Sequence, residues 1–279
     1  MNTNEKLKKI VREKYSEIAE KSDQTKACCG PSSTSCCSTD DDLKIFSMDY
    51  SSLEGYNPDA DLGLGCGLPT EFAKIQKGDT VVDLGSGAGN DCFVARQLTG
   101  PDGLVIGVDM TSNMIDKARA NAEKLNLKNV QFRLGEIENL PVKNNEADVV
   151  VSNCVLNLVP DKKGALEETY RILKNGGHFS VSDIVTYSEI PEGLRDEAAL
   201  YAGCVSGALI KDDYIKLIED VGFQNIKIQR EEKMNLPDSL LEKYLNKEEV
   251  EQYKNNFAGI ASITVYAEKP CCSGESNCC

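Results

Sequence analysis

The sequence has 279 residues, of which 41% are hydrophobic and 27% charged, a composition that fits one large domain or a core with additions. Lysine and arginine number 31 against 45 aspartate and glutamate residues, and the net charge of −14 argues against a nucleic-acid partner. No apolar run approaches the ~20 residues of a membrane span, which argues against a membrane partner. Residues 1–10 contain no apolar signal-peptide stretch. We therefore expect a cytoplasmic protein whose thiols are mostly reduced.

Cysteine and histidine contents constrain the chemistry. Twelve cysteines in a reducing compartment indicate binding of a soft ion or redox chemistry more than structural disulfides. His178 is the only histidine, so the reaction should not depend on histidine as a general base.

The chain begins and ends in segments outside the expected core. Residues 4–21 place apolar side chains at helical spacing and predict an amphipathic helix. Residues 27–42 are small, polar and turn-forming around two cysteine pairs, so we interpret them as a mobile linker. Similar paired cysteines return in residues 271–279.

Strands and helices alternate between these segments. Strands are predicted at 80–84, 104–108, 130–134, 148–151, 178–184, 226–228 and 260–267, the last near the sheet edge. Helices are predicted to end near residue 98 and to span 112–125, 165–173 and 212–221. This alternation, with short links, predicts a parallel sheet of seven strands covered by helices on both faces.

A glycine-rich turn follows the first predicted strand, in Asp83-Leu84-Gly85-Ser86-Gly87-Ala88-Gly89. Missing Cβ atoms let backbone N–H groups approach a ligand there. Asp109 ends the second strand, where an acid is placed to accept hydrogen bonds from both hydroxyls of a ribose. The combination indicates a cofactor that contains adenosine.

The details of this turn favour S-adenosylmethionine over a nicotinamide dinucleotide. Asn90 stands where the dinucleotide fingerprint requires its third glycine, and Asp83 beside the turn suits a sulfonium and an amino group. Glu136, after the third strand, is a candidate partner for the adenine amine. The alternative is that these residues are only tight turns and capping acids, and it is stronger for Glu136 alone than for the loop with Asp109.

Three cysteines are candidates for one site at the carboxyl edge of the sheet. Cys154 ends the fourth strand, where open α/β sheets bind ligands. Cys66 lies in a turn ahead of the sheet and Cys204 lies after the fifth strand, and both could fold over the same edge. Each cysteine could instead be a small buried apolar residue. We prefer this interpretation for Cys92, and it is the alternative for Cys66, Cys154 and Cys204.

These segments resemble the arsenite methyltransferases, which transfer methyl groups from S-adenosylmethionine to trivalent arsenic. The resemblance spans roughly residues 55–222. It is carried by Gly65-Cys66-Gly67, by Asp83-Leu84-Gly85-Ser86-Gly87 and Val108-Asp109-Met110-Thr111, and by the segments around Asn153-Cys154 and Gly203-Cys204. It implies an α/β fold with a Rossmann-like, seven-stranded class I methyltransferase sheet and N-terminal and C-terminal additions.

The resemblance also implies the site residues. By this resemblance, the residues that bind arsenic and act in catalysis are Cys66, Cys154 and Cys204. The residues that line the cofactor pocket are Asp83, Gly85, Gly87, Asp109, Met110, Glu136 and Asn153. Known members carry a fourth cysteine nearer the N-terminus. Cys28, Cys29, Cys36 and Cys37 all compete for that role, and none is assigned.

Four regions follow from this assignment. They are an N-terminal helix, cysteine-rich linker and cap at 1–75, a cofactor-binding Rossmann-like core at 76–187, an arsenic-site and sheet-completing region at 188–268, and a cysteine-rich tail at 269–279. The tail either captures arsenic from solution or is inert, and its deletion should leave the fold intact because no core element is expected to end there.

The implied reaction needs no general base, because arsenic bound to three thiolates keeps a lone pair that can attack the methyl carbon directly. Arsenite and methylarsenite would be the substrates in arsenic detoxification, and a thiol reductant such as glutathione or thioredoxin the partner. The alternatives are a methyltransferase for a small organic molecule, such as a quinone or lipid intermediate, and a metalloid-binding protein.

Overall fold

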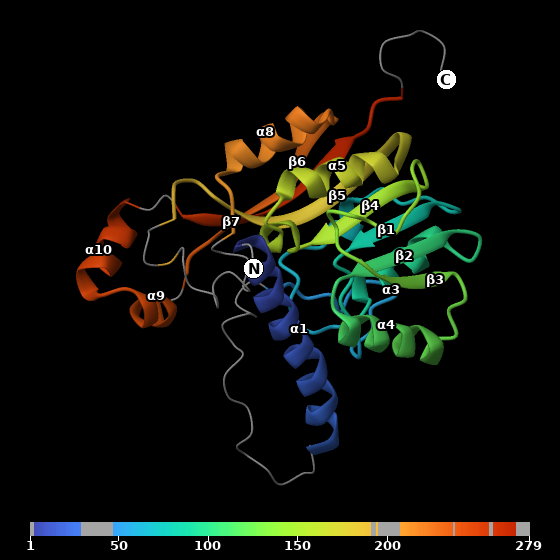
Figure 1. The fold of residues 1–279 in the computed structure, drawn as a ribbon, viewed down its shortest axis with the longest axis horizontal. Helices are drawn as coiled ribbons and strands as arrows, with labels where there is room; N and C mark the ends of the chain where they lie inside the picture. The colour runs from blue at the N-terminus through green and yellow to red at the C-terminus, as the bar shows by residue number, and fades with distance from the viewer. Residues whose placement is uncertain are drawn as a thin grey trace.

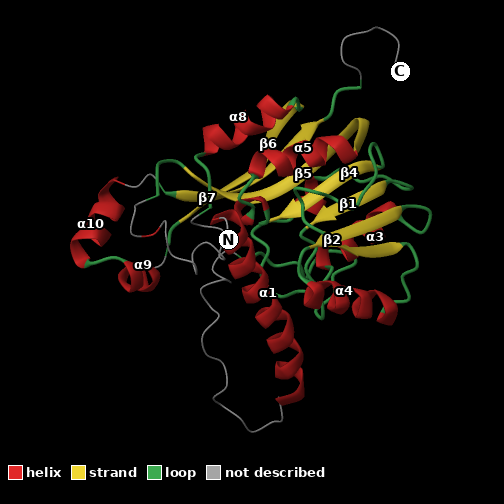
Figure 2. Ribbon diagram, in the orientation of Figure 1, coloured by secondary structure: helices red, strands yellow, loops and turns green. Residues whose placement is uncertain are grey.

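One seven-stranded sheet dominates the computed structural model, which describes residues 3–28, 47–190, 194, 207–236, 238–256 and 259–271 (Figures 1 and 2). Its strands are β1 (Thr80–Leu84), β2 (Leu104–Asp109), β3 (Val130–Leu134), β4 (Ala147–Asn153), β5 (Leu173–Thr186), β6 (Gln224–Met234) and β7 (Ile260–Glu268). They lie in the order β3-β2-β1-β4-β5-β7-β6. The predicted seven-stranded α/β sheet is therefore confirmed.

The direction of one strand differs from the predicted parallel sheet. β1 to β5 pair in parallel, whereas β7 lies antiparallel between β5 and β6. Thr186 pairs with Ile260 at one end of the β5–β7 ladder and His178 pairs with Glu268 at the other. Periodicity identifies a strand but not its neighbour, so the antiparallel insertion could not be predicted from residues 260–267 alone.

Helices cover both faces of the sheet because its central strands are apolar on both faces. Val81 packs in a core beneath α3 (Asn90–Thr99) and α4 (Ser112–Lys124). Its neighbour Val82 packs on the other face with α5 (Lys162–Ile172) and α8 (Lys211–Val221). Successive side chains of a strand point to opposite faces, so this run of valines buries one side chain in each core.

The strand order reverses beside β1, which pairs with β2 on one side and with β4 on the other. Leu84 at the end of β1 is in register with Ser152 of β4. The loops after these two strands therefore diverge from a common point, and in open α/β sheets ligands bind at this switch point.

The N-terminal helix is longer than predicted. α1 spans Thr3–Cys28 and runs beside α4, as Figure 1 shows. Val11 and Ala19 are buried along it. Within the described part of the chain, no helix combines the length and the apolar character needed to cross a membrane. The rest of the predicted linker, from residue 29 to residue 42, lies outside the described residues.

Four short helices were not predicted: α2 (Pro69–Phe72), the 3-10 helix η2 (Leu156–Leu158), α9 (Asp238–Tyr244) and α10 (Lys247–Asn256). Leu241 and Val250 from α9 and α10 join a third apolar core that also contains Cys66 and Cys154. These C-terminal helices therefore help to bury the predicted cysteine site.

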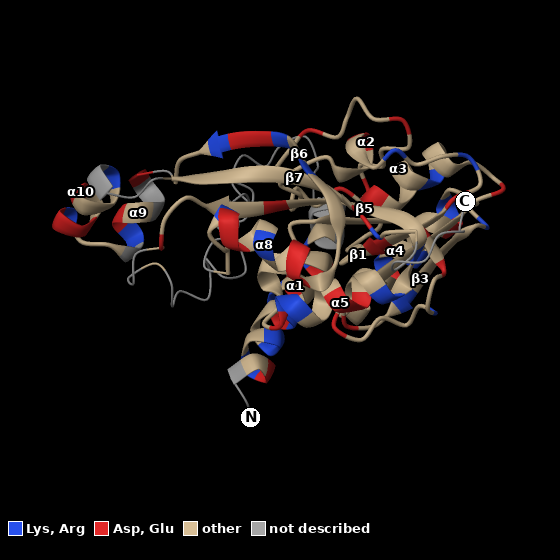
Figure 3. Ribbon diagram, turned by 90° about the horizontal axis from the view of Figure 1, so that it is seen from above, with Lys and Arg blue, Asp and Glu red and all other residues tan. Residues whose placement is uncertain are grey.

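Charged residues of both signs occur on α1, α5, α8 and α10 (Figure 3). The excess of negative charge is thus spread over several elements.

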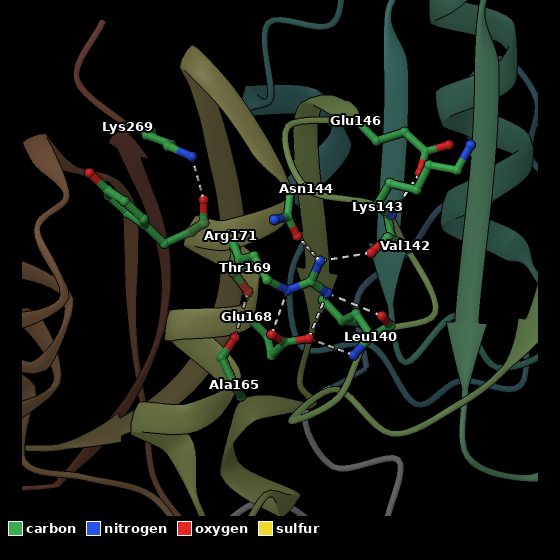
Figure 4. Close-up of polar contacts among 11 residues, drawn as sticks. Leu140, Val142, Lys143, Asn144, Glu146, Ala165, Glu168, Thr169, Arg171 and Lys269 are labelled. Atoms are coloured by element: carbon green, nitrogen blue, oxygen red, sulfur yellow. Dashed lines mark hydrogen bonds and ion pairs between the residues drawn. The ribbon is translucent and has the colours of Figure 1, made fainter. Parts of the chain in front are cut away.

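A salt bridge holds the loop that follows the third strand (Figure 4). The Arg171 guanidinium donates to the carboxylate of Glu168 at 2.6 and 2.7 Å and to the carbonyl oxygens of Leu140 and Val142 at 3.1 and 2.9 Å. Glu168 in turn accepts the backbone N–H of Leu140 at 2.7 Å. Arg171 and Glu168 thus both fix the backbone of the loop at residues 140–142.

Lys269, the first residue of the expected tail, packs against the core. Lys269 is only 8% exposed, and its Nζ donates to Asn145 Oδ1 at 2.9 Å and to the carbonyl oxygens of Tyr170 and Leu173 at 2.8 and 2.7 Å. These contacts argue that Lys269 belongs with the core, and the effect of deleting residues 269–279 on the fold stays a prediction. Residues 272–279 lie outside the described residues.

Candidate active site

A cavity lies at the carboxyl ends of β1, β2 and β4. Val11 and Lys8 of α1 contribute to its wall opposite the sheet. All seven predicted cofactor residues line it, namely Asp83, Gly85, Gly87, Asp109, Met110, Glu136 and Asn153. The sequence therefore predicted one connected surface, although the ligand contacts of these residues stay predictions.

The two loop glycines serve different purposes. Gly85 has a φ of +69°, and a Cβ atom there would lie 2.5 Å from the side chain of Val155. Gly87 has a φ of +50°, and a Cβ atom there would meet nothing within 4 Å. Gly85 is thus required for packing, whereas Gly87 leaves open space beside its backbone.

Asp109 organises this loop as well as facing the cavity. Its Oδ2 accepts the N–H of Gly87 at 3.0 Å, and its Oδ1 accepts the N–H of Thr111 at 2.8 Å. Burial raises the pKa of the carboxyl, and these backbone hydrogen bonds act in the opposite direction. The carboxylate is held in one orientation before any ligand arrives.

Glu136 contacts the N-terminal helix. Its two carboxylate oxygens accept from Lys8 Nζ at 2.7 Å and Arg12 Nη2 at 3.2 Å, and Lys8 also pairs with Glu138 at 2.9 Å. The sequence indicated Glu136 as an adenine partner but gave no sign that α1 would reach it. In the structure this residue fastens α1 across the cavity.

The carboxylates of Asp83 and Asp91 both line the cavity, and the charge of Asp91 acts on Asp83. Asp83 is 2% exposed, and burial followed by the charge of Asp91 raises its pKa well above the ordinary range. Burial also raises the pKa of Asp91, to about 6, although hydrogen bonds from Tyr50 and Asn153 oppose the shift. Among the described residues, Asp91 Oδ1 is shielded from solvent and has no hydrogen-bond partner. A cationic ligand would relieve both carboxylates.

Asn153 lines the cavity, but its amide is directed to the turn that carries Cys66. Its Oδ1 accepts the N–H groups of Cys66 and Gly67 at 3.0 and 3.2 Å, and its Nδ2 donates to the Gly67 carbonyl at 2.8 Å. The sequence analysis predicted a cofactor contact here. The structure adds a second role, which is to fix residues 65–67 against the end of β4.

Cys66 and Cys154 meet beside this turn. They are joined by a disulfide, with Cα atoms 5.8 Å apart, and they are 1% and 5% exposed. Cys154 also has a φ of +60°, and its N–H donates to the carbonyl of Ser182 at 2.7 Å. The structure thus brings two of the three predicted arsenic ligands together, joined by a bond although the sequence analysis expected mostly reduced thiols. Cys204 lies outside the described residues.

The other predicted cysteine and the histidine have different surroundings. Cys92 is buried beneath the sheet and its Sγ donates to Asp83 Oδ2 at 3.2 Å, a polar contact that its interpretation as an apolar core residue did not include. His178 lies outside the cavity, with its Nε2 2.6 Å from the carbonyl oxygen of Ala73.

Sequence reasoning missed Lys8, Tyr50 and Asp91, all of which line the cavity. Asp91 directly follows Asn90 in the glycine loop region, so its place in the first turn of α3 was a usable signal. Tyr50 lies in an irregular segment and Lys8 on a distant helix, and nothing local marks either residue.

Comparisons with known proteins agree with this geometry. A methyltransferase-domain family matches residues 75–222. The arsenite methyltransferase of Halobacterium salinarum is 42% identical over 233 residues, which cover 80% of this chain and 59% of that protein. The human arsenite methyltransferase is 42% identical over 168 residues, which cover 57% of this chain and 44% of that protein. The chain thus spans only about half the length of these curated relatives.

A solved structure shares both fold and sequence. The crystal structure of an arsenic(III) S-adenosylmethionine methyltransferase from Chlamydomonas reinhardtii matches with a TM-score of 0.61 and 32% identity. The match covers 76% of this chain and 69% of that one.

Proposed function

Because the chain belongs to the methyltransferase-domain family, and within it to the arsenite methyltransferases, we propose that it transfers methyl groups from S-adenosylmethionine to trivalent arsenic. One observation carries the proposal. Cys66 and Cys154, which are 88 positions apart, are joined by a disulfide, and Cys154 lines the cavity together with the carboxylates of Asp83 and Asp91. Paired sulfur ligands suit a soft metalloid, and the carboxylates suit a cationic methyl donor.

The described residues fit S-adenosylmethionine. Asp83 and Asp91 would face its positive groups, Asp109 would accept from the ribose hydroxyls, and the space beside Gly87 admits the ligand to the loop backbone. Met110 and Glu136 would border the adenine. When bound, this group supplies an electrophilic methyl carbon attached to a positive sulfur.

Arsenic is the second substrate, and we propose Cys66, Cys154 and Cys204 as its ligands. The Cys66–Cys154 disulfide must first gain two electrons and two protons from a thiol reductant such as glutathione or thioredoxin, which is itself oxidised to a disulfide. Three thiols then displace the oxygen ligands of arsenite as water. Arsenic thereby becomes fixed at a dry wall of the cavity, since both described cysteines are nearly inaccessible to solvent.

The chemical step needs no proton transfer from the protein. The arsenic lone pair forms the new bond to the methyl carbon, the carbon–sulfur bond breaks, and S-adenosylhomocysteine leaves with that electron pair. Arsenic is formally oxidised by two electrons, and the thiol reductant returns it to the trivalent state. The position of His178 outside the cavity is compatible with such a reaction.

We further propose that the protein acts in the cytoplasm, where thiol reductants are abundant, in arsenic detoxification. The division into regions 1–75, 76–187, 188–268 and 269–279 is kept as part of this proposal, with the amendment that Lys269 packs with the core.

Incubation of the reduced full chain with arsenite, S-adenosylmethionine and glutathione tests the function. Separation of arsenic species by chromatography, with elemental mass detection, should show methylated arsenic formed together with S-adenosylhomocysteine. Formation of S-adenosylhomocysteine from an added quinone but not from arsenite would contradict the proposal and favour a small-molecule methyltransferase.

A further inference from the structure

Tyr50 links the two halves of the cavity wall. Its side chain is buried, and its hydroxyl donates to Asp91 Oδ2 at 2.9 Å and lies 3.1 Å from the carbonyl oxygen of Gly67. The same hydroxyl accepts a hydrogen bond from Asn153 Nδ2, which also donates to Asp91 Oδ2 at 3.2 Å. Asp91 Oδ2 thus accepts hydrogen bonds from both the Tyr50 hydroxyl and the Asn153 amide.

The turn that carries Cys66 is packed directly on this network. A Cβ atom at Gly65 would lie 2.6 Å from Asn153 Nδ2, and one at Gly67 would lie 2.4 Å from the side chain of Ser182. The backbone N–H groups of Cys66 and Gly67 both donate to Asn153 Oδ1. A displacement of the Asn153 amide therefore has to move the turn, because no space separates them.

Asp91 lines the cavity, and the other oxygen of its carboxylate is shielded from solvent and has no hydrogen-bond partner among the described residues. The carboxylate therefore has one oxygen bound in the protein network and one oxygen without a partner. We propose that Tyr50, Asp91 and Asn153 form a positioning network through which a cationic ligand at Asp91 fixes the turn that holds Cys66. This inference rests on the proposed function, since the ligand is the methyl donor.

The physical basis is the charge on Asp91. Hydrogen bonds to an ionised carboxylate are shorter and roughly twice as strong as neutral ones. A cation in the cavity beside Asp91 stabilises the ionised carboxylate, which strengthens the bonds from Tyr50 and Asn153 to Oδ2. The Asn153 amide is then held more firmly, and with it the backbone of Cys66. Arsenic would accordingly meet an ordered thiol only after the methyl donor has bound.

The rate at which the Cys66 thiol is alkylated by iodoacetamide tests this coupling. The full chain is reduced, the reagent is added with or without saturating S-adenosylmethionine, and the modified Cys66 peptide is followed by mass spectrometry. In the wild type we expect the methyl donor to slow alkylation of Cys66 at least fivefold. No change in the wild type overturns the coupling.

Tyr50→Phe separates the network from direct shielding by the ligand. We expect the variant to show less than twofold protection of Cys66 at a concentration of S-adenosylmethionine that calorimetry shows to be saturating for it. The matched control is Tyr214→Phe, because Tyr214 is also a buried tyrosine that donates to an aspartate, Asp183 at 3.0 Å, outside the cavity. It should keep the full protection. A purely structural effect of Tyr50→Phe would accelerate alkylation equally in both states and leave the ratio unchanged, which overturns the proposal.

Asp91→Asn provides a second test that does not depend on the folding of Tyr50→Phe. Asparagine keeps an acceptor for Tyr50 but removes the charge, so protection at a saturating concentration of the ligand should also fall below twofold. Wild-type protection in this variant contradicts the network. Arsenite methylation is measured separately: if arsenic is never methylated while the protection and its loss in the variants are observed, the proposed substrate is wrong and the coupling stands.

Discussion

Asp109 accepts the backbone N–H of Gly87, so the carboxylate at the end of β2 fixes the middle of the loop that follows β1. Asp109→Ala removes both this acceptor and the proposed ribose contact. A charge-assisted hydrogen bond is worth ~1.5–3 kcal/mol, so S-adenosylmethionine should bind about tenfold more weakly or worse. Calorimetry on the full chain checks this, with Asp102→Ala in an exposed loop as the control. Equal affinities in all three proteins would remove Asp109 from the cofactor site.

Serine in place of Cys66 or Cys154 should abolish methylation of inorganic arsenite. A hydroxyl is a poor ligand for a soft centre, and Cys154 lines the cavity with Cys66 bonded to it. Cys271→Ser is the control, because Cys271 is exposed and outside the cavity. Arsenic speciation measures the outcome. Full activity in either of the first two variants would contradict the proposed ligand set, and the same test on Cys204→Ser addresses the third ligand.

Asp183 should make the protein less stable as the pH rises. Burial raises its pKa from 3.8 to about 7, although the Tyr214 hydroxyl, the charge of Lys162 and the backbone of Asn157 act against the shift. Between these pH values the folded protein keeps a proton that the unfolded chain has lost. The contribution of Asp183 to the free energy of unfolding therefore falls by up to about 1.4 kcal/mol per pH unit as the pH rises through this window, and it is fully retained only below pH 3.8.

Urea unfolding of Asp183→Asn at several pH values measures this effect. The variant should gain stability relative to the wild type as the pH rises from 3.8 to about 7, whereas Asp220→Asn, at an exposed position of α8, should follow the wild type. Parallel pH profiles for Asp183→Asn and wild type would mean that Asp183 does not titrate in this range.

Lys8→Ala should loosen α1 over the cavity. Lys8 bridges Glu136 and Glu138, and partly exposed ion pairs are worth ~0.2–1 kcal/mol each, so amide exchange around Val11 should accelerate about two- to tenfold. Hydrogen exchange with mass spectrometry provides the measurement. Lys9→Ala is the matched control, since the ion pair that Lys9 makes with Glu13 lies within α1. The difference should shrink in high salt, and equal exchange in both variants would show that the ion pairs do not hold the helix.

Lys269→Met should destabilise the fold even though residue 269 follows the last strand. The substitution leaves the carbonyl oxygens of Tyr170 and Leu173 without their buried donor, at a cost of ~1–3 kcal/mol. Lys128→Met, at an exposed position before β3, is the control. The midpoint of urea unfolding is compared for the two variants and the wild type. An unchanged midpoint for Lys269→Met would support the tail boundary expected from the sequence.

Much of the fold could be predicted because its signals are local. The strands at 80–84 and 130–134 have the predicted bounds, since each is a short apolar or alternating run between turn residues. The glycine loop and Asp109 were equally visible, because strand, turn and helix follow one another in the sequence. Local patterns were sufficient wherever a function depends on consecutive residues.

The remaining features depend on contacts between distant segments. The hydrogen bonds of Asn153 are set by the turn at 65–67 folding over the end of β4, and the placement of Lys8 is set by the docking of α1. Neither follows from periodicity or from a motif. For the same reason Asn153 could be predicted as a residue of the site, whereas its contact with the Cys66 turn could not.

The position of β7 has a consequence for the way the protein is made. Its residues, 260–268, are the last strand in chain order, yet they fill a gap between β5 and β6. During synthesis on the ribosome, β5 therefore presents an unpaired edge until residue 268 has emerged, and β6 has no neighbour to pair with. Such an edge is a template for pairing with other chains, so nascent copies should depend on chaperones until the final strand is inserted.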